Sequence, residues 1–178
     1  AALVDVLQQW AGQAAPFCRA AAEGRASVAE LMGACDALLI GNAPAWRASQ
    51  AQGQALLMAA AALRSDLGDL RRELAAADLP PHLAVAFGCC GRALGLDSPT
   101  TLELFAFTTL RSAMSAAVRL NIIGPLAAQA LQHGLAADLD RCVADGAQRD
   151  WQDAASCRPL FEVWHGHHDR LYSRLFQS

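Results

Sequence analysis

The stretch SPTTLELFAFTTLRSAMSAAVRLNIIGPLAAQAL, residues 98–131, contains the start and the end of one long helix and the start of the next. Ser98 followed by Pro99 is typical of a helix N-terminus, because the first turn tolerates a residue that has no N–H. No glycine or proline then occurs before Gly124-Pro125, a pair that ends one helix and opens another. The stretch therefore predicts a helix from Ser98 to about Leu120 and a second helix from Pro125.

The rest of the chain shows the same helical periodicity, with almost no strand-like alternation of apolar and polar residues. Asn42 and Pro44 predict a cap and a first-turn proline, and Gly68 is expected to break or to weaken the continuation of that helix. The predicted helices cover approximately residues 3–10, 28–39, 44–63 with a continuation to 77, 83–94, 98–120, 125 onward and 159–175. About eight helices with short connections predict an all-α, single-domain helical bundle over residues 1–178.

The charge composition excludes several classes of protein. The 14 basic residues are all arginine, and a P-loop NTPase or an imine-forming enzyme needs a lysine. The net charge is -3, and the arginines are spread along the chain without a basic run, which argues against nucleic acid as a partner. Scattered Cys and His without a known local signature also indicate that the protein is not an enzyme.

The cysteines and the apolar runs indicate a cytoplasmic protein. No Cys-x-x-Cys occurs among the six cysteines, so free buried thiols in a reducing compartment are expected. The charge-free run 120–137 has the length of a membrane span, but amides, a histidine and a Gly-Pro pair interrupt it, so no membrane segment is predicted. No secretory signal is apparent, and the chain opens inside a helical pattern, so a native N-terminal segment is expected to be missing.

Polar side chains form a seam along the predicted helix 98–120. At about 100° per residue, five of them fall in a stripe roughly 60° wide, namely Thr101, Thr108, Ser112, Ser115 and Arg119. Because the other faces are apolar, we expect this helix to be buried. One interpretation is that the hydroxyls bond back to the helix while Arg119 caps its C-terminal carbonyls. The other is that Arg119 anchors a buried network or an interface.

The segment WRASQAQGQALL, residues 46–57, contains two small residues one helical turn apart. Ser49 and Gly53 are expected to let the backbone of another helix approach closely. Arg47 lies at the same end of the segment, and we expect its side chain to be exposed.

The closing segment HGHHDRLYSRLFQS, residues 165–178, combines histidines with an apolar end. The histidines are weak candidates for a metal site and are otherwise surface residues: His165, His167 and His168. Tyr172, Leu175 and Phe176 combine apolar area with polar tips, which suits the anchor of an interface. We therefore expect this tail to dock on a partner, unless it folds back onto its own bundle.

These three segments resemble the family of the urease accessory protein UreF. The family pattern Arg-x-Ser-x-x-x-Gly-x-x-Leu resembles Arg47, Ser49, Gly53 and Leu56. The core Ser-Ala-Ala-x-Arg-Leu resembles residues 115–120, followed by Gly124 and Gln129, in a version that looks closer to plant and algal members. The family's closing His-Glu-x-x-Tyr-Ser-Arg-Leu-Phe-x-Ser resembles residues 168–178. This chain departs from the family at Ala128, Asp169 and Gln177, and it lacks the family's glycine-rich N-terminal segment.

The resemblance implies an all-α, often dimeric scaffold without a cofactor. Such a scaffold binds the accessory protein UreD, called UreH in some bacteria, and the GTPase UreG, and it modulates UreG within the complex that delivers nickel to apo-urease. The residues expected to contact a partner are Tyr172, Arg174, Leu175, Phe176 and Ser178. Those expected to hold the structure are Arg47, Ser49, Gly53, Ser115, Arg119, Gly124, Gln129 and His168. The alternative is a small nickel-binding protein that uses His165, His167 and His168.

Overall fold

The computed structural model describes residues 2–156, and within this range it contains nine α-helices, one short 3-10 helix and no strand. The all-α prediction is therefore confirmed. The elements are α1 (Ala2–Gln13), α2 (Ala15–Glu23), α3 (Val28–Leu39), α4 (Ala43–Ala61), α5 (Ser65–Ala76), α6 (Leu83–Ala93), α7 (Ser98–Arg119), α8 (Pro125–Gly134), α9 (Ala136–Gln148) and η1 (Trp151–Asp153). None of the helices in this range is long and apolar enough to cross a membrane.

Local capping groups fix several of the predicted helix starts. The Asn42 side chain accepts a hydrogen bond from the Ala45 N–H at 3.3 Å, which confirms the predicted start of α4. At the start of α7 the cap is Asp97, whose carboxylate accepts from the Thr100 N–H at 2.8 Å. These bonds satisfy N–H groups that have no partner inside the helix.

Three helix boundaries differ from the prediction. The helix predicted over residues 3–10 is α1, and a helix that was not predicted, α2, follows after a break at Ala14, just before Pro16, which lacks the N–H that a continuous helix would use. The segment after Pro125 divides into α8 and α9 at Leu135, directly after Gly134. Gly68 lies inside α5 and breaks nothing, because the chain already turns between α4 and α5.

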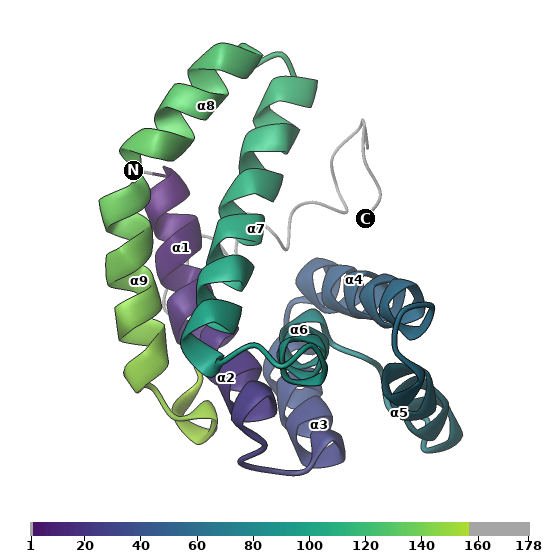
Figure 1. The fold of residues 1–178 in the computed structure, drawn as a ribbon. Coiled ribbons are helices and arrows are strands. Elements are labelled where there is room, and N and C mark those ends of the chain that lie inside the picture. The colour runs from purple at the N-terminus through teal and green to yellow at the C-terminus, as the bar shows by residue number, and fades with distance from the viewer. Residues whose placement is uncertain (1, 157–178) are drawn as a thin grey trace.

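Helix α2 lies at the centre of the molecule, where it packs most extensively against α6 (Figure 1). The packing is close because Gly88 of α6 has no side chain. An added Cβ at Gly88 would overlap the carbonyl oxygen of Cys18 and lie 2.8 Å from the Ala21 Cβ. Helices α1 and α9 pack against each other on one side of α2, and α4 packs on α5 and α6 on the other.

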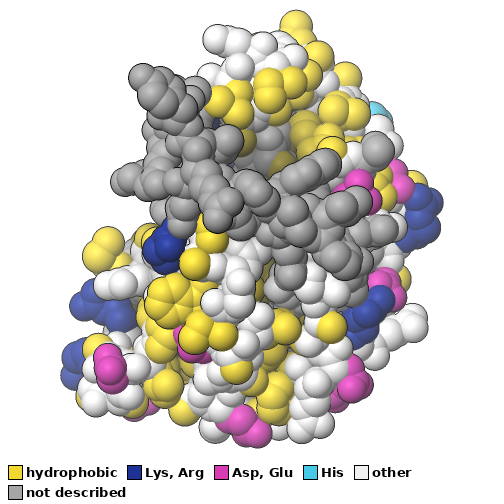
Figure 2. All heavy atoms as spheres, turned by 180° about the vertical axis from the view of Figure 1, so that it is seen from behind, with side chains coloured by type: hydrophobic (Ala, Val, Ile, Leu, Met, Phe, Trp, Pro, Cys, Tyr) yellow, Lys and Arg dark blue, Asp and Glu magenta, His cyan; other side chains and the backbone are white. Residues whose placement is uncertain are grey.

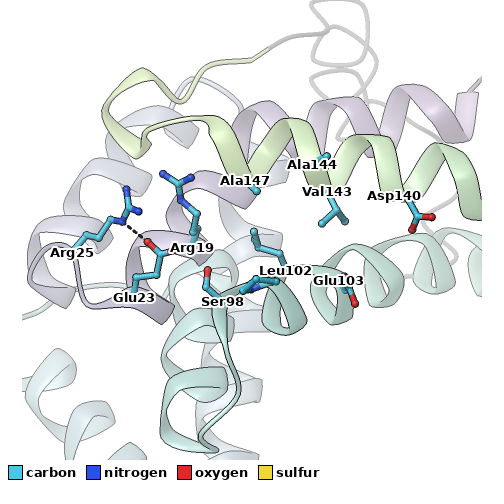
Figure 3. Close-up of a pocket in the computed structure, with 11 residues that line it drawn as sticks. Arg19, Glu23, Arg25, Ser98, Leu102, Glu103, Asp140, Val143, Ala144 and Ala147 are labelled. Atoms are coloured by element: carbon cyan, nitrogen blue, oxygen red, sulfur yellow. Dashed lines mark ion pairs between the residues drawn. The ribbon is translucent and has the colours of Figure 1, made fainter.

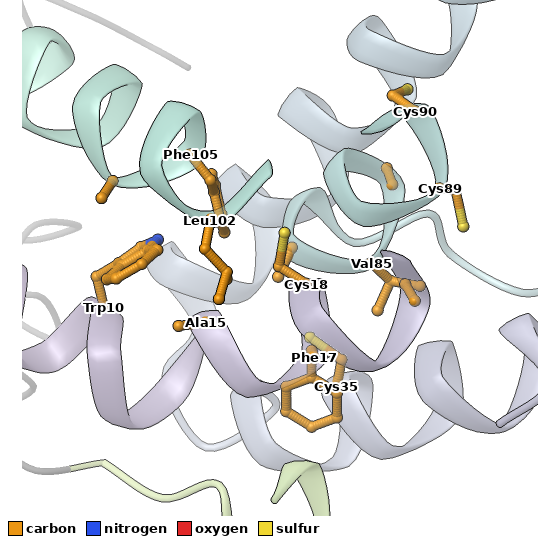
Figure 4. Close-up of a cluster of buried hydrophobic side chains, with 14 of the residues drawn as sticks. Trp10, Ala15, Phe17, Cys18, Cys35, Val85, Cys89, Cys90, Leu102 and Phe105 are labelled. Carbon is orange, nitrogen blue, oxygen red and sulfur yellow. The ribbon is translucent and has the colours of Figure 1, made fainter. Parts of the chain in front are cut away.

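The buried side chains form one cluster that joins both sides (Figure 4). Phe105 of α7 is at its centre. Its ring meets Trp10 edge-to-face at a centroid distance of 5.7 Å and stacks on Phe87 at 4.7 Å. Aromatic pairs in such arrangements contribute about 0.5–1.5 kcal/mol each beyond the burial of their area.

Candidate functional site

Helix α7 is buried only in its first two thirds, because its C-terminal end extends with α8 away from α4 and α5 (Figure 1). Met114 is the last buried residue of the helix, and both Ser115 and Arg119 are exposed. The expectation that this helix is buried along its whole length is therefore wrong. Of the polar seam only Thr101 is buried, and the seam is exposed from Thr108 onward.

The hydroxyls of the seam bond to the backbone of their own helix. Thr101 donates to the Asp97 carbonyl at 2.8 Å, and Thr108 donates to the Phe105 carbonyl at 2.9 Å. Arg119 lies in the last turn of α7, where its positive charge interacts favourably with the helix dipole. Gly124 and Gln129 are exposed as well, whereas Ala128 between them is buried.

Replacing Arg119 with alanine is expected to change the free energy of unfolding by less than about 1 kcal/mol, because the side chain is exposed and water screens its interactions. Chemical denaturation of the full chain measures this difference. A loss of about 3 kcal/mol or more would instead indicate a buried, paired guanidinium.

Apolar side chains are exposed where α7 passes into α8. Leu120, Ile122 and Leu126, which we call the α7–α8 tip, have exposed fractions of 42%, 69% and 88%. Figure 2 shows hydrophobic side chains gathered over this end of the molecule. Exposed apolar residues that lie close together are typical of surfaces that bind another protein. The tip lies inside the segment Ser115–Gln129, which carries the second motif of the sequence.

The first motif, around Ser49 and Gly53, lies where α4 meets the start of α6. An added Cβ at Gly53 would overlap the carbonyl oxygen of Pro81 and lie 2.8 Å from both the carbonyl carbon of His82 and the nitrogen of Leu83. One turn earlier, the Ser49 hydroxyl accepts a hydrogen bond from the Leu83 N–H at 3.3 Å. Ser49 and Gly53 thus contact the backbone of residues 81–83 at the start of α6. Arg47 is exposed.

A buried histidine that the sequence analysis missed completes this junction. The His82 side chain has an exposed fraction of 0%, and both ring nitrogens have partners. Nδ1 lies 3.1 Å from the Ser49 Oγ, and Nε2 lies 3.1 Å from the Asp36 Oδ1. The same Asp36 oxygen accepts from the Trp46 Nε1–H at 2.7 Å and from the Gln50 side chain at 3.4 Å. The only signal in the sequence was a histidine directly after Pro80-Pro81 at a helix start.

We call the residues Asp36, Trp46, Ser49, Gln50 and His82 the α3–α4–α6 network. It contains a serine, a histidine and an aspartate, the residue types of a nucleophilic triad. The Ser49 oxygen, however, is already held by the Leu83 N–H, and the His82 ring is closed to solvent. A substrate therefore cannot reach the His82 ring, and the hydrogen bonds of the network join three helices.

The protonation states in the network follow from its geometry. Burial lowers the pKa of His82 below 6.5, and the neighbouring Asp36 carboxylate only partly opposes this shift. Partial burial opposes ionisation of Asp36, but hydrogen bonds from Trp46 and His82 lower the pKa of its carboxyl group below 3.8. Since an ionised carboxylate only accepts, the neutral His82 donates from Nε2 and accepts the Ser49 hydroxyl at Nδ1.

The stability of the protein is therefore expected to fall as the pH falls below 6.5. In the unfolded chain His82 takes up a proton near that pH, whereas in the folded chain its lowered pKa keeps it neutral, so protonation favours the unfolded state. Urea denaturation at intervals from about pH 8 to about pH 5 measures the trend. In the variant His82→Gln this part of the pH dependence should be absent, and an unchanged dependence would contradict the assignment.

The remaining candidate residues from the sequence lie outside the described residues. They are His165, His167, His168, Tyr172, Arg174, Leu175, Phe176 and Ser178. Within residues 2–156, no group of three or more His, Cys, Asp or Glu side chains is placed to hold a metal ion. The five described cysteines are free and buried, and burial raises the pKa of Cys90 to about 11 and that of Cys35 to about 12. These thiols are protonated and unreactive at neutral pH.

Comparisons with known proteins agree on one family. The family model for UreF matches residues 1–136. The urease accessory protein F of Oryza sativa subsp. indica is 36% identical over 180 residues, which cover 98% of this chain and 69% of the rice protein. The Arabidopsis thaliana protein of the same name is 36% identical over 136 residues, covering 74% of this chain and 57% of that protein. The urease accessory protein UreF of Pseudomonas paraeruginosa is 32% identical over 113 residues, covering 64% of this chain and 50% of that protein.

Proposed function

Because the chain belongs to the UreF family of urease accessory proteins, we propose that it is a scaffold that joins UreD, or UreH, to the GTPase UreG in the complex that delivers nickel to apo-urease. An accessory protein assists an enzyme and is not one, so the chain itself is not an enzyme. In this proposal it modulates UreG, forms a homodimer and works in the cytoplasm, a reducing compartment that suits its free cysteines.

The observation that carries this proposal is the exposed α7–α8 tip. Leu126 and Ile122 leave most of their side-chain area in water. Each such side chain contributes about 1.5–3 kcal/mol when it is fully buried, which makes the tip suited to anchor a protein interface. The second family motif surrounds the tip, so the segment that carries this motif also carries Leu126, the most exposed large apolar side chain within residues 2–156.

The variant Leu126→Asp is expected to weaken assembly without weakening the fold. An exposed residue contributes within about 0.5 kcal/mol to stability, whereas loss of a central interface residue costs about 2 kcal/mol or more, roughly 30-fold in affinity. Co-purification with UreD, UreG and apo-urease, and nickel-dependent urease activation, measure the effect.

The matched control is Leu63→Asp, since Leu63 is 81% exposed but lies after α4, away from the tip. It should leave assembly intact. If Leu126→Asp assembles as well as the control does, the tip is not the interface. If the unmodified chain binds none of these proteins, the scaffold function itself is wrong.

The alternative function, a small nickel-binding protein, rests on His165, His167 and His168, outside the described residues. Calorimetry with nickel on the isolated full chain distinguishes the two functions. Tight stoichiometric binding that disappears when these three histidines are replaced would favour the alternative.

A further inference from the structure

A groove with a volume of about 560 Å³ runs between α2, the first turns of α7, and α9 (Figure 3). Helix α9 lines it with one face, because its four lining residues have the spacing i, i+3, i+4 and i+7: Asp140, Val143, Ala144 and Ala147. Buried Leu102 and Val143 form an apolar floor, with exposed fractions of 1% and 9%. Alanines on the α9 wall leave room for a third helix to lie close.

The two ends of the groove carry opposite charges. Arg19 lies at one end, and its buried Nε has no hydrogen-bond partner among the described residues. Beside it, Arg25 is paired with Glu23. Glu103 and Asp140 lie at the other end (Figure 3), both exposed, and within residues 2–156 neither takes part in an ion pair. A buried donor without a partner costs free energy, so a ligand that supplies an acceptor for Arg19 stabilises this site.

The shape of the groove favours a protein segment over a small molecule. Sites for small ligands enclose most of the ligand surface, whereas here the rim residues Glu103, Asp140 and Ala144 are exposed to solvent. An open groove with an apolar floor between two helices is the form that an amphipathic helix of a partner occupies.

We propose that this groove binds an amphipathic helix of another protein, with an acidic side chain at Arg19 and a basic side chain at Glu103 and Asp140. Along α9, Ala147 lies at the arginine end and Asp140 at the acidic end, seven residues apart, which corresponds to about 10 Å. The bound helix therefore carries its acidic and basic residues two turns apart, with apolar residues between them over Leu102 and Val143.

This inference rests on the proposed scaffold function, and it adds a second docking surface to the α7–α8 tip. The groove is at the N-terminal end of α7 and the tip is at its C-terminal end. Helix α7 has 22 residues and is therefore about 33 Å long. Surfaces separated by that length of rigid helix allow two partners to bind the chain at once.

The test places a photo-crosslinking side chain at Ala144, inside the groove, in a complex assembled from the purified full chain, UreD, UreG and apo-urease. The control carries the same group at Asp145, which is exposed on α9 but does not line the groove. Size-exclusion chromatography first establishes that the complex forms. The group at Ala144 should then crosslink to one of these proteins, at a helix with an acidic and a basic residue seven apart, and the group at Asp145 should not.

A charge exchange then tests the orientation. Asp140→Arg should weaken binding of the captured protein by about ten-fold or more. Replacing the basic residue of the captured protein's helix with glutamate should then restore binding to the Asp140→Arg variant. If the complex forms without a crosslink at Ala144, or if the crosslink joins a second copy of this chain or its own residues 157–178, the groove is not the proposed site. If no complex forms, the scaffold function fails and this inference fails with it.

Discussion

Replacing Gly53 with alanine is expected to lower the free energy of unfolding by about 3 kcal/mol. The added methyl group would overlap the Pro81 carbonyl oxygen and press on the backbone of His82 and Leu83. Backbone atoms move less readily than the end of a flexible side chain, so α4 and α6 must separate. That separation also disturbs the hydrogen bond from the Leu83 N–H to Ser49. Chemical denaturation of the full chain measures the loss.

The matched control is Gly33→Ala in α3, where an added Cβ has no atom of the described part of the chain within 4 Å. Alanine is the better helix former, so this variant should gain up to about 1 kcal/mol. Replacing glycine with alanine is thus expected to lower the free energy of unfolding at position 53 and to raise it at position 33. If Gly53→Ala were as stable as the unmodified protein, the close approach of α4 and α6 would be wrong.

Replacing His82 with alanine is expected to cost about 3 kcal/mol or more, for two separate reasons. The ring is fully buried, so its removal leaves a cavity, and loss of a large buried side chain typically costs about 2–5 kcal/mol. The Ser49 hydroxyl and the Asp36 carboxylate also each lose a partner in the α3–α4–α6 network. The midpoint of urea denaturation should fall accordingly.

The exposed His133 supplies the control, because His133→Ala removes the same side chain from the surface of α8. It should change stability by less than about 1 kcal/mol. A His82→Ala variant as stable as this control would show that the network does not hold the three helices together. Because Trp46 donates to Asp36, its fluorescence should also report the loss of the network in the folded His82→Ala protein.

The first two family motifs have different roles in the structure. Ser49 and Gly53 are the two motif residues that meet the chain at the start of α6: Gly53 is buried against its backbone, and the Ser49 hydroxyl accepts from the Leu83 N–H. The segment Ser115–Gln129, in contrast, forms the exposed tip. One motif thus maintains the fold, and the other supplies the surface on which the proposed assembly depends.

The sequence by itself determined the helical elements, because the interactions that form a helix are local. Apolar periodicity, the Asn42 cap and the Gly124-Pro125 pair act on residues a few positions away, so they can be recognised without a structure. The motifs that identify the family are likewise short patterns in the printed sequence. The sequence analysis did not predict α2 and did not separate α8 from α9, since a single proline or glycine is compatible with a bend as well as with a break.

Tertiary structure alone decided which residues meet. His82 and Asp36 are 46 positions apart and come together only because α3, α4 and α6 converge. Arg19 and Asp140 define the two ends of one groove only because α9 packs beside α2. The exposure of Arg119 was decided in the same way: an apolar pattern shows that a helix can be buried, but burial requires neighbours on every face, and the face of α7 that carries Ser115 and Arg119 is exposed. Packing depends on contacts between residues that are distant in the chain, and no local sequence pattern encodes such contacts.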